Sequence, residues 1–455
     1  MNKKISISLL YLLILAGTAH AALRVTDLRT EQLKNPLGID IRHPRLGWRI
    51  ESDEQNVMQT AYHILVASSP ELLAQGKGDC WDSGKVKTDA SQWITYQGET
   101  LKRNTPYYWK VKVYTHTNET DWSEPASWSM GLLNEADWQG QWIGLDRPAP
   151  GDSETQWSRL AARYLRKEFA LTKEVKRATV HIAGMGLYEL FINGQRIGEQ
   201  VLAPAPTDYR KTILYNTYDV TPQLQKENAI GVILGNGRFY TMRQNYKPYK
   251  IPTFGYPKLR LNLIVEYTDG SRQTIASDIS WKLTTEGPIR SNNEYDGEEY
   301  DARKELGDWN RTGYDDTNWI PAGRVSIPSG TLRAQMMPGM KVTESLKPVS
   351  IRKQGDKHIL DIGQNMAGWL RIRIKGQAGD SIRLRFAERL QADGEIFTKN
   401  LRDAHCTDIY VVSGREPQDT TWAPRFVYHG FRYVEISGYP NAKTCLLYTS
   451  DAADE

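Results

Sequence analysis

The stretch Leu259-Arg260-Leu261-Asn262-Leu263-Ile264-Val265-Glu266-Tyr267 has a large apolar side chain at every second position. Successive side chains of a strand point to opposite faces, so a period of two predicts a β-strand with one buried face. The Asp269-Gly270 pair that follows is typical of a tight turn. The same period recurs at 107–114, 370–375 and 382–386, while long helical periodicity is nearly absent. The chain is therefore predicted to be all-β, built from tandem antiparallel β-sandwiches.

Breaks in the strand pattern divide the chain into three sandwich units. The first unit ends in Leu101-x-x-x-Thr105-x-Tyr107-x-Trp109-x-Val111, which resembles the last strands of a fibronectin type III domain. A segment rich in Trp, Gly and Pro follows and is predicted to be a connector. The predicted organisation is 1–21 for a signal peptide, 22–133 for the fibronectin type III-like domain, 134–157 for the connector, 158–330 and 331–440 for two further sandwiches, and 441–455 for a tail.

The first 21 residues have the features of a secretory signal peptide. A positive start, Met1-Asn2-Lys3-Lys4, precedes an apolar run at 5–16, and Ala19-His20-Ala21 provides the small-x-small cleavage pattern. No later stretch reaches the roughly 18 apolar residues of a membrane span. The mature protein is therefore predicted to be a soluble bacterial protein, periplasmic or secreted, with no membrane partner.

The tail and the cysteines suggest that the chain is a fragment without a disulfide framework. Residues 445–455 resemble the translation of a transposon adapter used in sequencing libraries, which predicts a truncated end; a genuine linker is the alternative. Cys80 and Cys406, which lie outside the tail, are far apart in sequence and are expected to fall in different domains.

Composition excludes some classes of partner. Lys and Arg number 58 against 54 Asp and Glu, and the excess is spread along the chain rather than gathered in a basic block. No nucleic-acid partner is therefore predicted. The 14 Trp and 24 Tyr, against 8 Phe, suit β-sandwiches and sugar-facing surfaces. No CxxC, HExxH or other metal-ligand spacing occurs, so no cofactor is expected to be required.

Several motifs occur in an order and spacing that indicate a family. The motifs are 188–194, Asp208-Tyr209-Arg210, Asp219-Val220-Thr221, Leu234-Gly235-Asn236-Gly237, 295–303, Asp361-Ile362-Gly363-Gln364-Asn365-Met366-Ala367-Gly368-Trp369, Phe386-Ala387-Glu388 and Phe426-x-Tyr428-His429-Gly430-Phe431-Arg432-Tyr433. Together they resemble the N-terminal region of glycoside hydrolase family 78, the bacterial α-L-rhamnosidases, over nearly all of 24–440. One departure is Arg238, where family members often have Trp.

The resemblance implies both a fold and an activity. The unit at 158–330 would be a jelly roll and the unit at 331–440 a concanavalin-like sandwich. Family members hydrolyse terminal α-L-rhamnosides with inversion, using a general acid and a carboxylate that activates water from the opposite face. Both carboxylates lie on an (α/α)₆ barrel that follows the third sandwich, so no catalytic residue is assigned in this chain. The implied partners are a rhamnose-containing oligosaccharide or glycoside and the chain's own missing catalytic barrel.

An acidic loop is the strongest candidate site within the chain itself. A glycosidase needs paired carboxylates, but alternation along a strand would put Asp296 and Glu298 on one face and Glu299 and Asp301 on the other. The main interpretation is therefore a structural loop with Arg303 and Arg290 as candidate partners. The alternative is a Ca²⁺ site or a contact lining a sugar pocket, because hard oxygen ligands cluster here.

Two Asn-Gly pairs provide weaker candidates. Asn193 and Asn236 each precede a glycine, which is typical of turns because Gly tolerates positive φ. A sugar site at a loop end of the jelly roll is the functional alternative. The candidate carbohydrate-binding residues are thus Asn193, Asn236, Asp296 and Glu298. A non-catalytic carbohydrate-binding or adhesion protein remains the rival to the enzyme.

The signal peptide makes a direct prediction about processing. Exported protein should begin at Ala22, because Ala19 and Ala21 fit the small-residue pattern that signal cleavage requires. N-terminal sequencing of material recovered from the periplasm or the medium checks this, and a sequence that begins at Met1 would refute export by this route.

Overall fold

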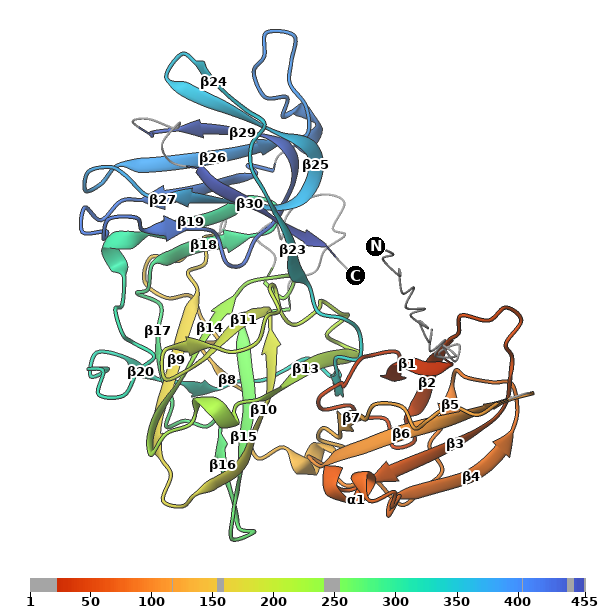
Figure 1. Ribbon diagram of the computed structural model, residues 1–455. Helices are drawn as coiled ribbons and strands as arrows, with labels where there is room; N and C mark the ends of the chain where they lie inside the picture. Colours follow the sequence, from red (N-terminus) through yellow and green to blue (C-terminus); the bar gives the residue numbers. More distant parts are fainter. Residues whose placement is uncertain are drawn as a thin grey trace, which may run out of the picture. The chain divides into compact units, whose positions relative to one another are not determined.

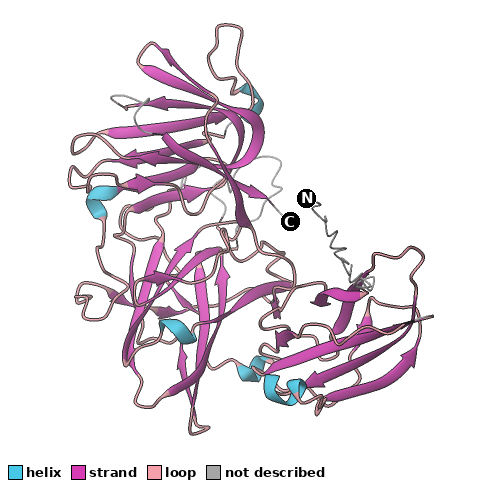
Figure 2. Ribbon diagram, in the orientation of Figure 1, coloured by secondary structure: helices cyan, strands magenta, loops and turns pink. Residues whose placement is uncertain are grey.

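The computed structural model describes residues 23–116, 118–153, 159–240, 254–402, 404–439 and 446–453. The signal peptide predicted at 1–21 lies outside these residues. Strands make up most of the structure, which confirms the all-β fold class (Figure 2). The helical elements are short: α1 (Pro70–Ala74) and the 3₁₀ turns η1 (Glu135–Asp137), η2 (Thr221–Gln223), η3 (Ala302–Lys304) and η4 (Lys399–Leu401). No helix of the described chain has the length and apolar character needed to cross a membrane.

The described residues form two compact units, of which the first comprises the described residues of 23–36, 42–101 and 106–128. One of its sheets has the order β1 (Arg24–Thr30), β2 (Arg45–Glu51), β5 (Ile94–Thr95). The other has the order β4 (Trp81–Lys87), β3 (Gln59–Ala67), β6 (Pro106–Thr115), β7 (Ala126–Ser129). β6 contains the alternating stretch 107–114, and its even members Tyr108, Lys110 and Lys112 are partly exposed, whereas the odd members are buried. Trp48 and Trp109 fill the core between the sheets.

The second compact unit begins with a two-layer jelly roll (Figure 1). Its seven-stranded sheet has the order β21 (Gly323–Arg324), β8 (Ile143–Gly144), β15 (Lys258–Tyr267), β10 (Val175–Met185), β13 (Thr212–Asp219), β22 (Thr331–Ala334), with β16 (Arg272–Ala276) beside β15. Its six-stranded sheet has the order β12 (Gln195–Arg196), β11 (Leu187–Ile192), β14 (Glu227–Gly235), β9 (Arg163–Ala170), β17 (Lys282–Thr284), β20 (Ile320–Pro321).

β15 lies in the middle of the seven-stranded sheet and is buried on both faces. Leu259, Leu261, Leu263 and Val265 belong to the core between the two sheets, as their spacing predicts. Asn262, on the opposite face, is fully buried as well. Its polar side chain is accommodated there because it accepts a hydrogen bond from the Gly140 N–H and donates one to the Asp137 carbonyl. The period of two predicted one buried face for this strand and did not predict that its opposite face is covered.

The segment that covers this face corrects the predicted connector at 134–157. Trp138 and Trp142 are each 7% exposed, and Ile143 and Gly144 form β8, which pairs with β15. The Trp- and Gly-rich composition of the segment indicated a linker, but its indole rings and backbone amides belong to the jelly roll.

The third sandwich is built on one ten-stranded sheet that folds over itself (Figure 1). Its path has the order β18 (Ile289–Asn293), β19 (Gly297–Asp301), β27 (Thr407–Val411), β26 (Ser381–Ala387), β29 (His429–Ser437), β25 (Lys357–Arg373), β30 (Leu446–Ala453), β23 (Lys341–Leu346), with β24 (Ser350–Gln354) and β28 (Thr421–Trp422) also paired to β25. β25 is 17 residues long, and its register with β29 shifts between Asp361 and Met366, next to Gly363 at a φ of +93°. β29 pairs with β25 on both sides of this shift, whereas β24 pairs with the first half of β25 and β28 and β30 pair with its second half.

Strands cross the domain boundary predicted at residue 330 in both directions. β18 and β19 precede it, yet β19 pairs in parallel with β27 of the third sandwich. β22 follows it, yet pairs in parallel with β13 of the jelly roll. The jelly roll and the third sandwich are therefore joined by exchanged strands rather than by a simple linker.

The jelly-roll core predicts a contrast between two apolar positions. Leu263→Ala should lower the free energy of unfolding by about 2–5 kcal/mol, because Leu263 is 0% exposed and its loss leaves a cavity. Ile279→Ala removes a side chain that is 62% exposed and should change it by less than about 0.5 kcal/mol. Denaturant unfolding of the two variants beside the parent measures the difference; equal effects would contradict the assigned core.

Candidate functional site

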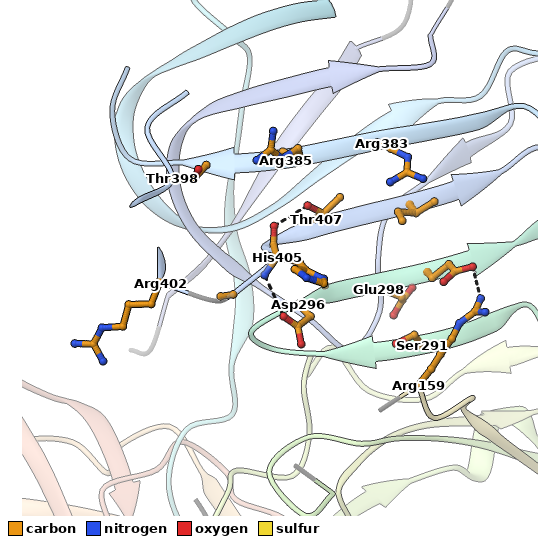
Figure 3. Close-up of a pocket in the computed structure, with 14 residues that line it drawn as sticks. Arg159, Ser291, Asp296, Glu298, Arg383, Arg385, Thr398, Arg402, His405 and Thr407 are labelled. Carbon is orange, nitrogen blue, oxygen red and sulfur yellow. Dashed lines mark hydrogen bonds and ion pairs between the residues drawn. The ribbon is translucent and has the colours of Figure 1, made fainter. Parts of the chain in front are cut away.

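A cavity of about 670 Å³ lies on one face of the third sandwich, across β18, β19, β27 and β26 (Figure 3). Arginine, acidic and hydroxyl side chains dominate its lining. The residues that line it are Arg159, Ser291, Asp296, Gly297, Glu298, Glu299, Arg383, Arg385, Thr398, Arg402, Ala404, His405, Thr407 and Ile409.

Strand register explains why these side chains meet. Ser291 pairs with Glu299, Glu299 with Ile409, and Ile409 with Arg383, so the four form one row across four strands. Arg385 pairs with Thr407 in the next row. Side chains two residues apart on a strand share a face, so Arg383 and Arg385 stand about 7 Å apart along β26, on the cavity side. The alternation at 382–386 predicted that both would be outside the core.

The cavity arginines have different ion-pair partners. Arg159 pairs with Glu299 across the cavity wall. Arg385 pairs at 3.2 Å with Glu435, a buried carboxylate that Lys357 also contacts at 3.2 Å. Within the described parts of the chain, Arg383 is exposed and forms no ion pair with a carboxylate. The same holds for Arg402, in the loop after η4, so Arg383 and Arg402 are the cavity guanidinium groups whose charge no carboxylate of the described chain matches, and Arg383 is the one held on a strand of the sheet.

Asp296 is held at the rim by the backbone of a neighbouring loop. It precedes β19 in the turn that follows β18, and its Oδ1 accepts a hydrogen bond of 3.0 Å from the His405 N–H. The Thr407 N–H donates to the Asp296 carbonyl at 2.9 Å. These bonds fix the loop that leads into β27 beside the cavity.

Glu298 belongs to the interior rather than to the surface. Its side chain is 1% exposed, its Oε2 accepts from the backbone N–H groups of Arg425 and Phe426 at 3.1 Å each, and its own N–H donates to Asp408. Burial, together with the charge of Asp408, raises the pKa of Glu298 to about 8 in spite of the two N–H donors. Glu298 is therefore largely protonated at neutral pH.

Asp408 also connects Glu298 to a buried histidine. His429 Nε2 lies 3.0 Å from Asp408 Oδ1, and His429 Nδ1 lies 3.3 Å from the Cys406 Sγ. Burial alone would lower the pKa of His429, but the Asp408 carboxylate outweighs it and raises the pKa to about 10. Strand alternation within the acidic loop could not reveal Asp408, on β27, or His405, in the loop before β27, because both are more than 100 residues further along the chain.

The two asparagine candidates lie at opposite ends of the β11–β14 ladder. Asn193 follows Ile192, which pairs with Ile230, whereas Asn236 follows Gly235, which pairs with Leu187. The five steps between these pairs already span about 17 Å, and each asparagine lies one residue beyond its pair, so the two are further apart than that. Neither amide lies in the cavity: Asn193 bonds to Asn228 and Gln223, and Asn236, fully buried, bonds to Asn292.

The remaining acids of the loop are paired with arginines. Asp301 pairs with Arg303 at 2.8 Å, as the sequence suggested. Arg290 instead donates to the Thr285 and Gly287 carbonyls. Glu294 pairs at 2.9 Å with Arg238, the residue that stands where the resemblance led us to expect Trp. Sequence reasoning missed this pair because 56 residues separate its members.

The arrangement does not gather the acids around one point. In the described residues, no group of three or more His, Cys, Asp or Glu side chains is arranged to hold a metal ion. The chemistry available in the cavity is that of guanidinium and hydroxyl donors, which bind oxyanions and sugar hydroxyls.

Three family models match the chain in succession. The Rha78A-like N-terminal immunoglobulin domain matches 25–134, the alpha-L-rhamnosidase N-terminal domain 173–344, and the bacterial alpha-L-rhamnosidase concanavalin-like domain 351–451. The chain belongs to the bacterial α-L-rhamnosidase family. The first model describes an immunoglobulin domain where the sequence resembled fibronectin type III, and both are antiparallel sandwiches.

Individual α-L-rhamnosidases resemble the chain along most of its length. One from Formosa agariphila is 38% identical over 428 residues, which is 89% of this chain and 45% of that protein. The structure of the Dictyoglumus thermophilum enzyme superposes with a TM-score of 0.85 at 38% identity, covering 94% of this chain and 49% of that one. The Streptomyces avermitilis enzyme, solved in complex with L-rhamnose, gives 0.84 at 28% identity, covering 95% of this chain and 57% of that one. The chain thus spans about half the length of the curated relatives it matches.

The buried carboxyl group predicts a pH-dependent stability. A carboxyl whose pKa is higher in the folded than in the unfolded chain destabilises the fold increasingly as pH rises from about 4.5 to about 8, because the unfolded chain loses the proton more easily. Glu298→Gln stays neutral and can still accept from Arg425 and Phe426. Its melting temperature should exceed that of the parent by at least about 2 °C at pH 8, and the difference should shrink towards pH 5.

Glu299→Gln provides the matched control for this measurement. Glu299 lies next to Glu298 on β19, and its substitution removes a partly exposed ion pair with Arg159. This change should not raise the melting temperature at pH 8. Calorimetric scans at pH 5, 6.5 and 8 compare both variants with the parent. A Glu298→Gln difference that is independent of pH would show that Glu298 is not buried in its neutral form.

Proposed function

We propose that the chain is the N-terminal part of an exported α-L-rhamnosidase that hydrolyses terminal α-L-rhamnosides with inversion. The observation that carries this proposal is the succession of three α-L-rhamnosidase domain models along one chain, at 25–134, 173–344 and 351–451. The relatives named alpha-L-rhamnosidase support it at 30–38% identity over about nine-tenths of the chain. The L-rhamnose complex of the Streptomyces avermitilis enzyme supports a rhamnose-containing substrate.

The proposed chemistry requires groups that this part of the protein does not bring together. An inverting glycosidase needs two carboxyl groups roughly 6.5–9.5 Å apart, with room for the sugar and an attacking water between them. Glu298 is enclosed and bonded to backbone amides, and Glu299 is paired with Arg159. Asp296 accepts a hydrogen bond from the His405 N–H, which ties its carboxylate to the loop before β27. We therefore assign catalysis to the part of the relatives' length that the chain does not span.

In this proposal the three sandwiches support a separate catalytic domain. The parallel pairing of β19 and β22 makes the jelly roll and the third sandwich one continuous support, since the sheet of each contains a strand from the other's region of the sequence. Rigid elements of this kind hold a neighbouring active site more precisely than loops do. Export is inferred from the signal-peptide pattern at 1–21.

Activity assays on two lengths of the protein test the assignment. The present chain should release no rhamnose from an aryl α-L-rhamnoside, whereas a protein extended by about 400 residues of its reading frame should release it, because that length accommodates the missing domain. Proton NMR of the first-formed sugar should show the β-anomer, as inversion requires.

Two results would contradict the proposal. The first is rhamnose release by the present chain alone that is lost on Asp296→Asn, which would move the chemistry into the cavity. The second is a reading frame that ends without a catalytic domain, or an extended protein that is folded but inactive. That outcome would favour a non-catalytic carbohydrate-binding protein.

A further inference from the structure

We propose that the cavity on the third sandwich is a binding site for an anionic sugar unit, one that carries a carboxylate or a sulfate ester. The inference rests on the proposed function for its carbohydrate context, and it adds a second recognition site and a charge preference to that function. Its basis is the set of donors on the cavity face of β18, β19, β27 and β26.

The first argument is the unequal state of the arginines. Glu299 occupies Arg159, and Glu435 occupies Arg385 in part. Arg383 stands beside them on the same face and, in the described chain, has no carboxylate partner. A guanidinium presents a rigid fork that matches a planar carboxylate or a sulfate in two hydrogen bonds. Arg402, in the loop after η4, likewise has no ion-pair partner in the described chain, but Arg383 is the unpaired guanidinium that stands on the sheet between the paired Arg159 and Arg385.

The second argument is the balance of charge around that fork. The lining contains four arginines against Asp296, Glu298 and Glu299. Glu298 is turned into the interior, where burial raises its pKa to about 8, so at neutral pH it adds little negative charge. Glu299 is neutralised by Arg159. The cavity therefore has a net positive charge, which favours an anion over a neutral group.

The third argument is space and the presence of hydroxyl groups. A cavity of about 670 Å³ falls in the usual range for small-ligand sites. Ser291 and Thr398 contribute hydroxyl groups to its wall, which suit the ring hydroxyls of a sugar.

Calorimetric titration of the present chain tests the site. The probes are trigalacturonate, galactose 6-sulfate and, as the neutral match, galactotriose. Binding of at least one anionic probe is expected, weakened by added salt, while galactotriose should bind at least about tenfold more weakly, since loss of a charged hydrogen-bond partner has that magnitude. The anionic probe that binds more tightly shows whether the site prefers a carboxylate or a sulfate ester.

Substitutions connect the binding to Arg383. Arg383→Gln should weaken the anionic probe about tenfold, and Arg383→Lys, which keeps the charge without the fork, should weaken it less. Both change an exposed side chain, so their melting temperatures should equal that of the parent. Arg147→Gln is the matched control, because Arg147 is another exposed arginine of the same compact unit and lies outside the cavity.

Several outcomes would overturn the proposal. Equal binding of galactotriose would refute the charge preference, and unchanged binding by Arg383→Gln would refute the site. Inorganic sulfate that binds as tightly as both sugar probes would show an anion site without carbohydrate recognition. None of these results depends on rhamnose release by a longer protein, so failure of the binding site and failure of the proposed activity can be told apart.

Discussion

The parallel pairing of β19 with β27 is the constraint on which the rest of the site depends. It joins residues 299–301 to residues 409–411, more than a hundred positions apart, and so attaches the end of the jelly-roll sequence to the third sandwich. The approach of the two strands is close at Gly297, where φ is +106° and a Cβ atom would lie 2.1 Å from the Thr407 carbonyl oxygen. Only glycine meets both conditions, so this position sets where β19 can start.

The pairing of β19 with β27 also determines which charged side chains lie on each face of the sheet. Once β19 is in register, Glu298 must point inward, where the Arg425 and Phe426 N–H groups donate to it and burial, together with the charge of Asp408, raises its pKa. Glu299 must point outward, where Arg159 pairs with it. An acidic sequence thus produces an interior that holds a neutral acid and an exterior dominated by arginine. The charge of the linear motif is a poor guide to the charge of the surface it forms.

Local pattern predicted the strands, while pairing over long distances decided the site. The alternation at 107–114 and 258–267 correctly placed β6 and β15, because the period of two depends only on neighbouring residues. The partners of the acidic loop could not be found in this way: Arg159 is 140 residues from Glu299, and no local rule selected it over Arg290. The segment 134–157 was predicted to be a connector for a similar reason, since Ile143 and Gly144 pair with β15, more than 110 residues away, and Trp138 packs against Tyr215. Of the four candidate residues, Asp296 and Glu298 share the cavity, and the two asparagines have structural bonds elsewhere.

Cross-strand neighbours also explain why one arginine, rather than the pair, would control recognition at the cavity. Arg385 and Arg383 are two residues apart on β26 and face the same side, but β29 places Glu435 beside the first and Ser437 beside the second. The side chain of Glu435 is 2% exposed and is contacted at 3.2 Å by both Arg385 and Lys357, so moving Arg385 towards a ligand would weaken the pairing of a buried carboxylate. Ser437 carries no charge, so Arg383 can reorient towards a ligand without breaking an ion pair. The residue type on β29, Glu435 opposite Arg385 and Ser437 opposite Arg383, therefore separates an arginine that stabilises the sandwich from one that is available to bind.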